Sequence, residues 1–296
     1  TPSNSSAASD VYKRQIIYFS SNPYVNSKVC VKGFCAKNKF KKVIDVWDLG
    51  WDQTIGTVPP QNVNRVVKLM LTTYKLRHRL GCKSDHFRVV IHYMQPHFPY
   101  IIIRNSINNT ITKISKMYNA SGETVFLMLL KTLFNDEYKV AKVLRLLYEE
   151  NLRLSLAYVA DLVSYLDGTT VITSDHGESF GENDIWGHGG LPIESQVRVP
   201  LLIHYPPEVK EPKVIAEQVQ TTSLYSTILK TLNVPLPAFT VQKGFNINLL
   251  KTGESEKNKP PQYTFAERFY LNEYRGMLRS NRWKYLVKKI ADDKDG

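Results

Sequence analysis

The residues best suited to chemistry lie between positions 171 and 206, in the sequence VITSDHGESFGENDIWGHGGLPIESQVRVPLLIHYP. A short apolar run, Val171–Thr173, leads through Ser174 to Asp175 and His176. Ligand sites in open α/β sheets form at the carboxyl ends of strands, so this placement favours a functional pair. A carboxylate oxygen beside an imidazole nitrogen suits Zn²⁺, Mn²⁺ or a similar divalent ion. The pair is therefore a candidate metal site.

A third candidate side chain follows twelve residues after His176. His188 lies in the segment Trp186–Gly190, WGHGG, where the glycines permit sharp changes of backbone direction. Such a loop can bring the imidazole back to the Asp-His pair, as a further metal ligand or as a proton donor. The alternative interpretation is an ordinary polar turn after a strand, which an Asp-His pair alone does not exclude.

Alternating strands and helices are predicted around these residues. Short apolar runs predict buried parallel strands, and segments with a three-to-four-residue apolar period predict helices between them. Strands that alternate with helices favour an α/β fold with a largely parallel sheet. The predicted strands are Ile16–Phe19, Phe87–His92, Thr170–Thr173 and Leu201–His204, and the predicted helices span about 59–77, 138–166 and 222–232.

Several segments, in order along the chain, resemble the sulfatase family of the alkaline phosphatase superfamily. The metal-binding segment of this family resembles three stretches of the chain taken together, SDHGESFGEN, WGHGG and VRVPLLIHYP. Its H-x-M-x-P-H-x-P-Y loop is similar to HYMQPHFPY at positions 92–100. YEENLRLSLAYVADLV from Tyr148 resembles the helix before the Asp-His strand. SLYSTILKTLNVPLP resembles a later helix, although Ser223 and Ser226 replace the usual Asp and Pro. VIDVWDLGWDQTIGTVPP (43–60) resembles archaeal members of the group.

The resemblance implies a fold and a division into domains. The expected fold is an α/β three-layer sandwich with a mostly parallel sheet, alkaline phosphatase-like, followed by the start of a small C-terminal α+β subdomain. Residues 16–251 would form the catalytic domain, and 252–296 a linker and the start of that subdomain. Residues 1–15, TPSNSSAASDVYKRQ, lack apolar periodicity and are interpreted as a non-native leader.

The resemblance also implies roles for four residues. Asp175 and His176 would be metal ligands, and His97 would bind the ester oxygens or protonate the leaving group. His188 stands where relatives have a substrate- or metal-contacting residue. The implied cofactor is a divalent ion, Ca²⁺ in a sulfatase, or Mn²⁺ or Zn²⁺ if the enzyme transfers phosphoryl groups. Glu178 and Glu182 are given no role.

The nucleophile of the family is not found in this sequence. Family members carry it in a C/S-x-P-x-R motif, which becomes formylglycine in sulfatases, after a strand with one or two metal-binding Asp residues. No such motif occurs here. We therefore expect the motif upstream of residue 16, with formylglycine only in that segment. The chain is interpreted as truncated at the N-terminus and also at the C-terminus, and as inactive by itself.

The leading functional hypothesis is a metal-dependent hydrolase of sulfate esters. The first alternative is a phosphatase, phosphodiesterase or phosphoethanolamine transferase of the same superfamily, which an Asp-His rather than an Asp-Asn pair keeps open. The second is a non-catalytic, sulfatase-like anion-binding protein.

The charge of the chain agrees with an anionic substrate, either sulfated or phosphorylated. Thirty-nine basic and 27 acidic residues give a net charge of +12, and such a surface attracts anions. No nucleic-acid-binding motif accompanies the lysines, so no nucleic-acid partner is predicted.

The longest apolar run, Val125–Leu130, is far shorter than the roughly 20 residues of a membrane span. Only three cysteines are present, which favours reduced thiols and a cytoplasmic location.

Overall fold

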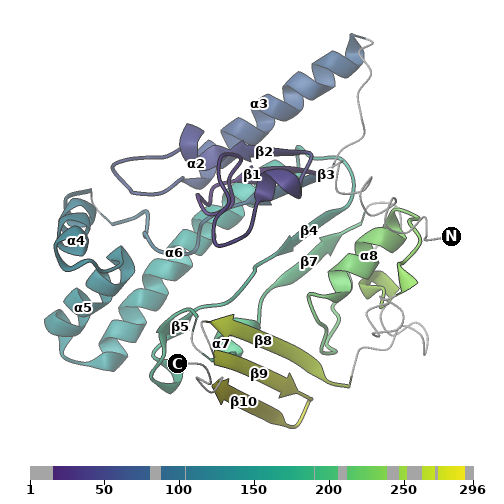
Figure 1. Cartoon of the computed structure of the whole chain (residues 1–296). Coiled ribbons are helices and arrows are strands. Elements are labelled where there is room, and N and C mark those ends of the chain that lie inside the picture. Colours follow the sequence, from purple (N-terminus) through teal and green to yellow (C-terminus); the bar gives the residue numbers. More distant parts are fainter. Residues whose placement is uncertain are drawn as a thin grey trace, which may run out of the picture. The chain divides into compact units, whose positions relative to one another are not determined.

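The computed structural model describes residues 16–80, 88–103, 105–189, 191–205, 212–238, 247–251, 262–270 and 273–290. The predicted leader, 1–15, lies outside these residues, as does the 252–261 part of the predicted linker. The chain forms two compact units, Thr1–Asp167 and Gly168–Gly296 (Figure 1). The predicted boundary at 251/252 therefore stays a prediction.

A three-stranded parallel sheet organises the first unit. Its order is β2-β1-β3, with β1 (Ile16–Ser20) between β2 (Lys42–Asp45) and β3 (Arg88–His92). Ser20, the last residue of β1, is paired with Asp45 on one side and His92 on the other. The three strands therefore end at the same edge of the sheet, from which the loop bearing His97 departs.

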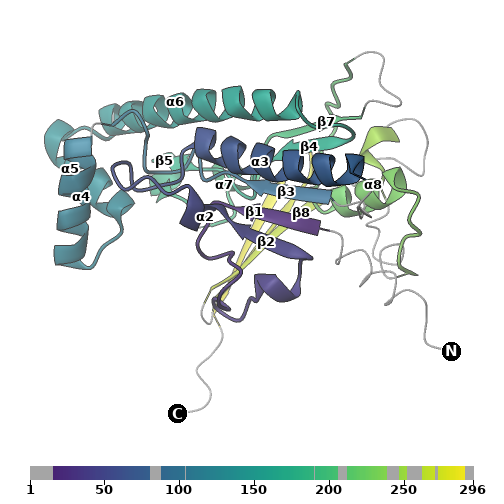
Figure 2. The ribbon, with the colours of Figure 1, turned by 90° about the horizontal axis from the view of Figure 1, so that it is seen from above.

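Helices α3 (Pro60–Arg79) and α6 (Glu137–Val163) lie on the same side of this sheet (Figure 2). Alternate residues of β1, Ile17 and Phe19, are 1% exposed and face these helices across the core. The helical side of that core comes from Val63, Val67 and Leu71 of α3 and Leu162 of α6.

Local sequence explains where the helices of the first unit begin. Pro60 starts α3, a position that needs no backbone N–H donor. Ser121 caps α5 (Gly122–Phe134) by accepting a hydrogen bond from the Thr124 backbone N–H, and Asp136 caps α6 by accepting from two backbone N–H groups. The remaining helices are α2 (Val46–Leu49), α4 (Asn105–Tyr118), α5 (Gly122–Phe134) and a 3-10 turn at Ala36–Asn38.

The second unit contains antiparallel pairs. β4 (Thr170–Thr173) pairs with β7 (Leu201–His204) in antiparallel register, so the parallel arrangement predicted for these two strands is wrong. A parallel connection needs a crossover of a dozen or more residues, usually through a helix. The described residues between β4 and β7 instead form a small hairpin, β5 (Ser179–Phe180) and β6 (Trp186–Gly187), and one-turn helices at Glu182–Asp184 and α7 (Glu194–Val197).

The C-terminal part of the second unit is a three-stranded antiparallel sheet of order β10-β9-β8. Its strands are β8 (Thr264–Tyr270), β9 (Glu273–Arg279) and β10 (Lys284–Ile290). Helix α8 (Ser223–Thr231) and a 3-10 turn at Leu249–Lys251 complete the described elements of the unit.

Two of the three cysteines form a disulfide, which corrects the expectation of reduced thiols. Cys30 and Cys35 flank a tight turn in which Val31 and Phe34 form an isolated antiparallel bridge. The turn brings the two cysteine Cα atoms to 4.2 Å, and spacing along the sequence alone does not reveal this. Cys82 lies outside the described residues.

Among the described helices, none is both long and apolar enough to cross a bilayer.

Candidate functional site

In the first unit, His97 lies in the loop that follows β3. Its Nδ1 donates a hydrogen bond to the carbonyl oxygen of Phe98. A carbonyl oxygen only accepts, so Nδ1 carries the proton, and Nε2 is the nitrogen with the lone pair in the neutral ring. The local backbone thus selects the tautomer that can offer Nε2 to a metal or to an ester oxygen.

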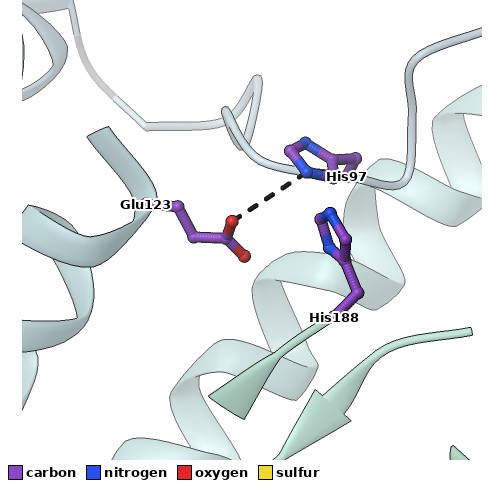
Figure 3. Close-up of side chains that lie close together, drawn as sticks. All are labelled: His97, Glu123 and His188. Carbon is purple, nitrogen blue, oxygen red and sulfur yellow. Dashed lines mark ion pairs between the residues drawn. The ribbon is translucent and has the colours of Figure 1, made fainter. Parts of the chain in front are cut away.

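Glu123, in the first turn of α5, lies beside this imidazole. Its Oε2 is 3.9 Å from His97 Nε2, and the two side chains point toward each other (Figure 3). The contact is an ion pair when the imidazole is protonated. The two side chains are 28% and 33% exposed, so both are accessible to a solute. Sequence reasoning did not single out Glu123, because its only local signal is that of an acidic residue in a first helical turn.

The loop that bears His97 is held by one buried amide. Asn151 on α6 is 0% exposed, and its Nδ2 lies 3.2 Å from the carbonyl oxygens of Pro96 and His97 and 3.1 Å from that of Pro99. Its Oδ1 accepts a 2.9 Å hydrogen bond from the Ile101 backbone N–H. One side chain therefore contacts four backbone groups of the loop, with its two N–H donors shared among three carbonyl oxygens, and fixes the loop to α6.

In the second unit, Asp175 and His176 follow β4 after one intervening residue, Ser174. His176 Nδ1 donates to the Gly177 carbonyl oxygen at 2.9 Å, and its Nε2 is 3.8 Å from Asp175 Oδ1. Zn²⁺ ligands lie about 2.0–2.2 Å from the ion, so two of them are at most about 4 Å apart. The separation of these two atoms fits a single ion bound by both.

His188 lies against this pair within the same unit. Its ring stacks on that of His176 with 4.4 Å between the centroids, and its Nδ1 is 3.3 Å from both carboxylate oxygens of Glu178. The Glu178 side chain is 6% exposed. A carboxylate that receives the second N–H of a histidine is the usual support of a metal-binding imidazole.

The β5–β6 hairpin explains this juxtaposition. Ser179 pairs with Gly187 in this antiparallel hairpin. The residue before Ser179, Glu178, and the residue after Gly187, His188, are therefore brought side by side. Gln196 of α7 fixes both segments. Its backbone carbonyl accepts from the Gly177 N–H at 2.7 Å, and its Oε1 accepts from the Gly189 N–H at 3.0 Å.

Gly177 is required at its position for steric reasons. A Cβ placed there would lie 2.1 Å from the backbone carbonyl oxygen of Ser195. The glycine of the SDHG motif therefore lets the backbone after His176 approach α7 closely. The close approach in turn makes the hydrogen bond from Gly177 to Gln196 possible.

The structure thus gathers the predicted residues into two groups, one in each unit. Asp175, His176 and His188 lie together in the second unit, with Glu178 as an addition that the sequence did not reveal. His97 lies with Glu123 in the first unit. The roles that the resemblance implies for all four residues stay predictions.

Comparison with known proteins gives a family match over most of the chain. The sulfatase family model matches residues 21–234, which include the His97 loop and the segment from Asp175 to His188. A solved 2-O GAG sulfatase is similar in structure, with a TM-score of 0.43 and 17% identity over 50% of this chain. This chain covers 34% of that protein's length. No curated protein matches the chain. The family match and the parallel β2-β1-β3 sheet confirm the expected alkaline phosphatase-like α/β fold.

Proposed function

The chain belongs to the sulfatase family, and on this premise we propose that it supplies the metal-ligand and substrate-binding segments of a metal-dependent hydrolase of sulfate esters. The observation that carries the proposal is the grouping of Asp175, His176 and His188 after β4, inside the matched region. The grouped carboxylate oxygen and imidazole nitrogens are ligands that suit a divalent ion.

Asp175 and His176 are the residues proposed to hold the ion. When bound, a divalent ion would offset the negative charge of the ester oxygens and stabilise charge that builds up during cleavage. Ca²⁺ is the ion proposed for sulfate-ester hydrolysis, and Mn²⁺ or Zn²⁺ for phosphoryl chemistry.

His97 and His188 are proposed to act on the ester itself. Each imidazole is oriented through Nδ1, by a backbone carbonyl at His97 and by the Glu178 carboxylate at His188. Each would therefore use Nε2 to bind an ester oxygen or to protonate the leaving group, as a general acid does.

Metal binding tests the ligand assignment without any need for turnover. We expect calorimetric titration of the 296-residue chain with Ca²⁺, Mn²⁺ and Zn²⁺ to show one weak site. Asp175→Asn and His176→Ala should each lower the affinity about 10-fold or more, because each removes a ligand. Asp167→Asn is the matched control, since its side chain is 94% exposed. Unchanged affinity in the Asp175 and His176 variants would overturn the assignment.

Ester specificity is tested with this chain joined to a segment that carries the C/S-x-P-x-R motif. We expect turnover of p-nitrophenyl sulfate that chelation of divalent ions abolishes. His97→Ala should lower turnover by roughly 10²–10⁴-fold while metal affinity is retained, because a general acid contributes to the reaction but not to metal binding. Preferred turnover of p-nitrophenyl phosphate or its diester would instead favour the phosphoryl-transferring alternative.

The cytoplasmic location remains a prediction. The Cys30–Cys35 disulfide weighs toward an oxidising compartment, where such bonds persist.

A further inference from the structure

A closed turn connects β1 and β2 in the first unit. We call residues 28–42 the basic turn. Its tip is closed by the disulfide and by two backbone hydrogen bonds of 3.0 and 2.9 Å between Val31 and Phe34. The two central residues, Lys32 and Gly33, have φ angles of 47° and 80°. Positive φ at both central positions is the geometry of a tight type I′ hairpin turn.

The base of the basic turn is fixed to the sheet. Ser27 donates to the Asp45 carboxylate through its backbone N–H at 2.9 Å and through its hydroxyl at 2.5 Å. Asn26 Oδ1 accepts from the backbone N–H groups of Lys28 and Val29 at 2.9 and 2.7 Å. The tip is therefore held in one orientation relative to the edge of β2.

The basic turn carries a concentrated positive charge. Positions 16–44 include six lysines and no Asp or Glu. Lys28 pairs with Asp48 at 2.7 Å. Four other lysines are exposed and form no ion pair with any residue that the structure describes: Lys32, Lys37, Lys39 and Lys42.

Apolar side chains stand among these lysines. Val29 is 60% exposed and Phe34 42% exposed, and Tyr24 nearby is 66% exposed. Because the tip is closed by the disulfide and its base is fixed, the side chains of Phe34 and Val29 cannot fold back into a core without breaking the turn. Contact with another apolar phase is the remaining way to remove them from water.

We propose that the basic turn docks onto an anionic phospholipid bilayer, with Phe34 and Val29 entering the headgroup region and the lysines among the lipid phosphates. Unneutralised lysines beside a negatively charged membrane surface attract it electrostatically. A soluble polyanion would satisfy the lysines but not the apolar tip, so the combination favours a bilayer. The basic turn contains none of the residues proposed to act in catalysis.

Vesicle co-sedimentation of the whole 296-residue chain tests the proposal. The vesicles are phosphatidylcholine alone, or phosphatidylcholine with about one third phosphatidylglycerol, whose charge the lysines would sense. We expect binding to the anionic vesicles only, weakened at high salt. Phe34→Ser should lower the partition coefficient about 10-fold. Lys37→Gln/Lys39→Gln should lower it about 25-fold, at about 1 kcal/mol for each lysine.

Matched control variants lie on α4, away from the basic turn in the sequence. Met117→Ser removes a side chain that is 69% exposed, and Lys113→Gln/Lys116→Gln removes two exposed charges. Both should bind anionic vesicles as the wild type does, and all variants should give the circular dichroism spectrum of the wild type. Absence of vesicle binding, or equal loss in the control variants, would overturn the proposal. Binding that depends on the lysines but not on Phe34, and that soluble heparin abolishes, would identify a polyanion instead and would also overturn it.

Discussion

Two buried residues with amide side chains, Asn151 and Gln196, hold the backbone of the loops that carry the histidines. Asn151 holds the loop of His97 through contacts with four backbone groups. Gln196 holds the residues that follow His176 and His188, because its backbone carbonyl accepts from the Gly177 N–H and its side-chain oxygen accepts from the Gly189 N–H. Loops usually carry functional side chains, but they position them well only when their own backbone groups are held. In each unit a single buried residue provides that support.

Asn151→Ala tests how much this support contributes to stability. Its loss leaves three carbonyl groups and one N–H group without their partner in a buried setting. We expect the free energy of unfolding to fall by about 3 kcal/mol, measured by urea denaturation.

A change at the neighbouring position provides the control for this variant. Glu150→Ala removes an exposed side chain from the same helix and should change the free energy of unfolding by at most about 0.5 kcal/mol. Equal effects of the two substitutions would show that the amide is not the anchor of the loop.

The sequence revealed some of these residues and not others, for physical reasons. Asp175, His176 and His97 lie in motifs whose spacing along the chain is itself informative. Glu178 becomes a partner of His188 only through the register of the β5–β6 hairpin. Asn151 is one polar residue on a long helix, and its function depends on a loop 50 residues away in the chain.

At the scale of elements, a polar network joins α3, α6 and β3. Asn64 on α3 donates to Asp161 Oδ2 at 2.8 Å, and Lys68 Nζ lies 2.7 Å from Asp161 Oδ1. Tyr93, which follows β3, donates its hydroxyl proton to Asn64 Oδ1 at 2.5 Å. Burial, and to a smaller extent the charge of Asp161, raise the pKa of Tyr93, so its hydroxyl remains a donor.

This network predicts a pH dependence. Hydrogen bonds from Lys68 and Asn64 lower the pKa of Asp161 below its value of about 3.9 in an unfolded chain. The stability that the carboxylate contributes is therefore present above about pH 4 and is lost as the pH falls through the lower, folded-state pKa.

Asp161→Asn removes this titrating group and should make stability less sensitive to acid. We expect the free energy of unfolding to fall less between about pH 5 and about pH 2 in the variant than in the wild type. Urea denaturation at both pH values measures the difference. Parallel losses in the two proteins would contradict a stabilising role for the charge.

Helix α3 also offers an internal comparison of buried and exposed positions. Leu71 is 7% exposed and belongs to the core, whereas Leu69 is 68% exposed. Leu71→Ala should lower the free energy of unfolding by about 2–5 kcal/mol, because it leaves a cavity. Leu69→Ala, the same change on the same helix, should alter it by at most about 0.5 kcal/mol. Similar urea midpoints for the two variants would show that α3 does not pack through Leu71.

Apolar periodicity predicted α3, α6 and α8 to within a few residues, because each buries one face along its length. The predicted strands were also found, but the antiparallel pairing of β4 and β7 was not predicted. A short apolar run in the sequence does not show whether its strand will run parallel or antiparallel to its neighbour. That direction is decided by the connection between the two strands. Helices α4 and α5 were not predicted.

At the scale of the whole molecule, the decisive sequence feature is the absence of a C/S-x-P-x-R motif from the 296 residues. We expect the chain by itself not to hydrolyse p-nitrophenyl sulfate or phosphate in the presence of Ca²⁺, Mn²⁺ or Zn²⁺, because the family's nucleophile is not among its motifs. A continuous absorbance assay checks this expectation. Metal-stimulated turnover that Asp175→Asn abolishes would show that a residue of this chain serves as the nucleophile.

The junction between the two units has a consequence for protein engineering. Asp167 and Gly168 are exposed, and the glycine has a φ of 101°, with no atom of any residue other than its chain neighbours within 4 Å of where its Cβ would stand. Insertions are best tolerated where the backbone is exposed and few contacts are lost. The chain can therefore be opened at this point to receive a reporter domain.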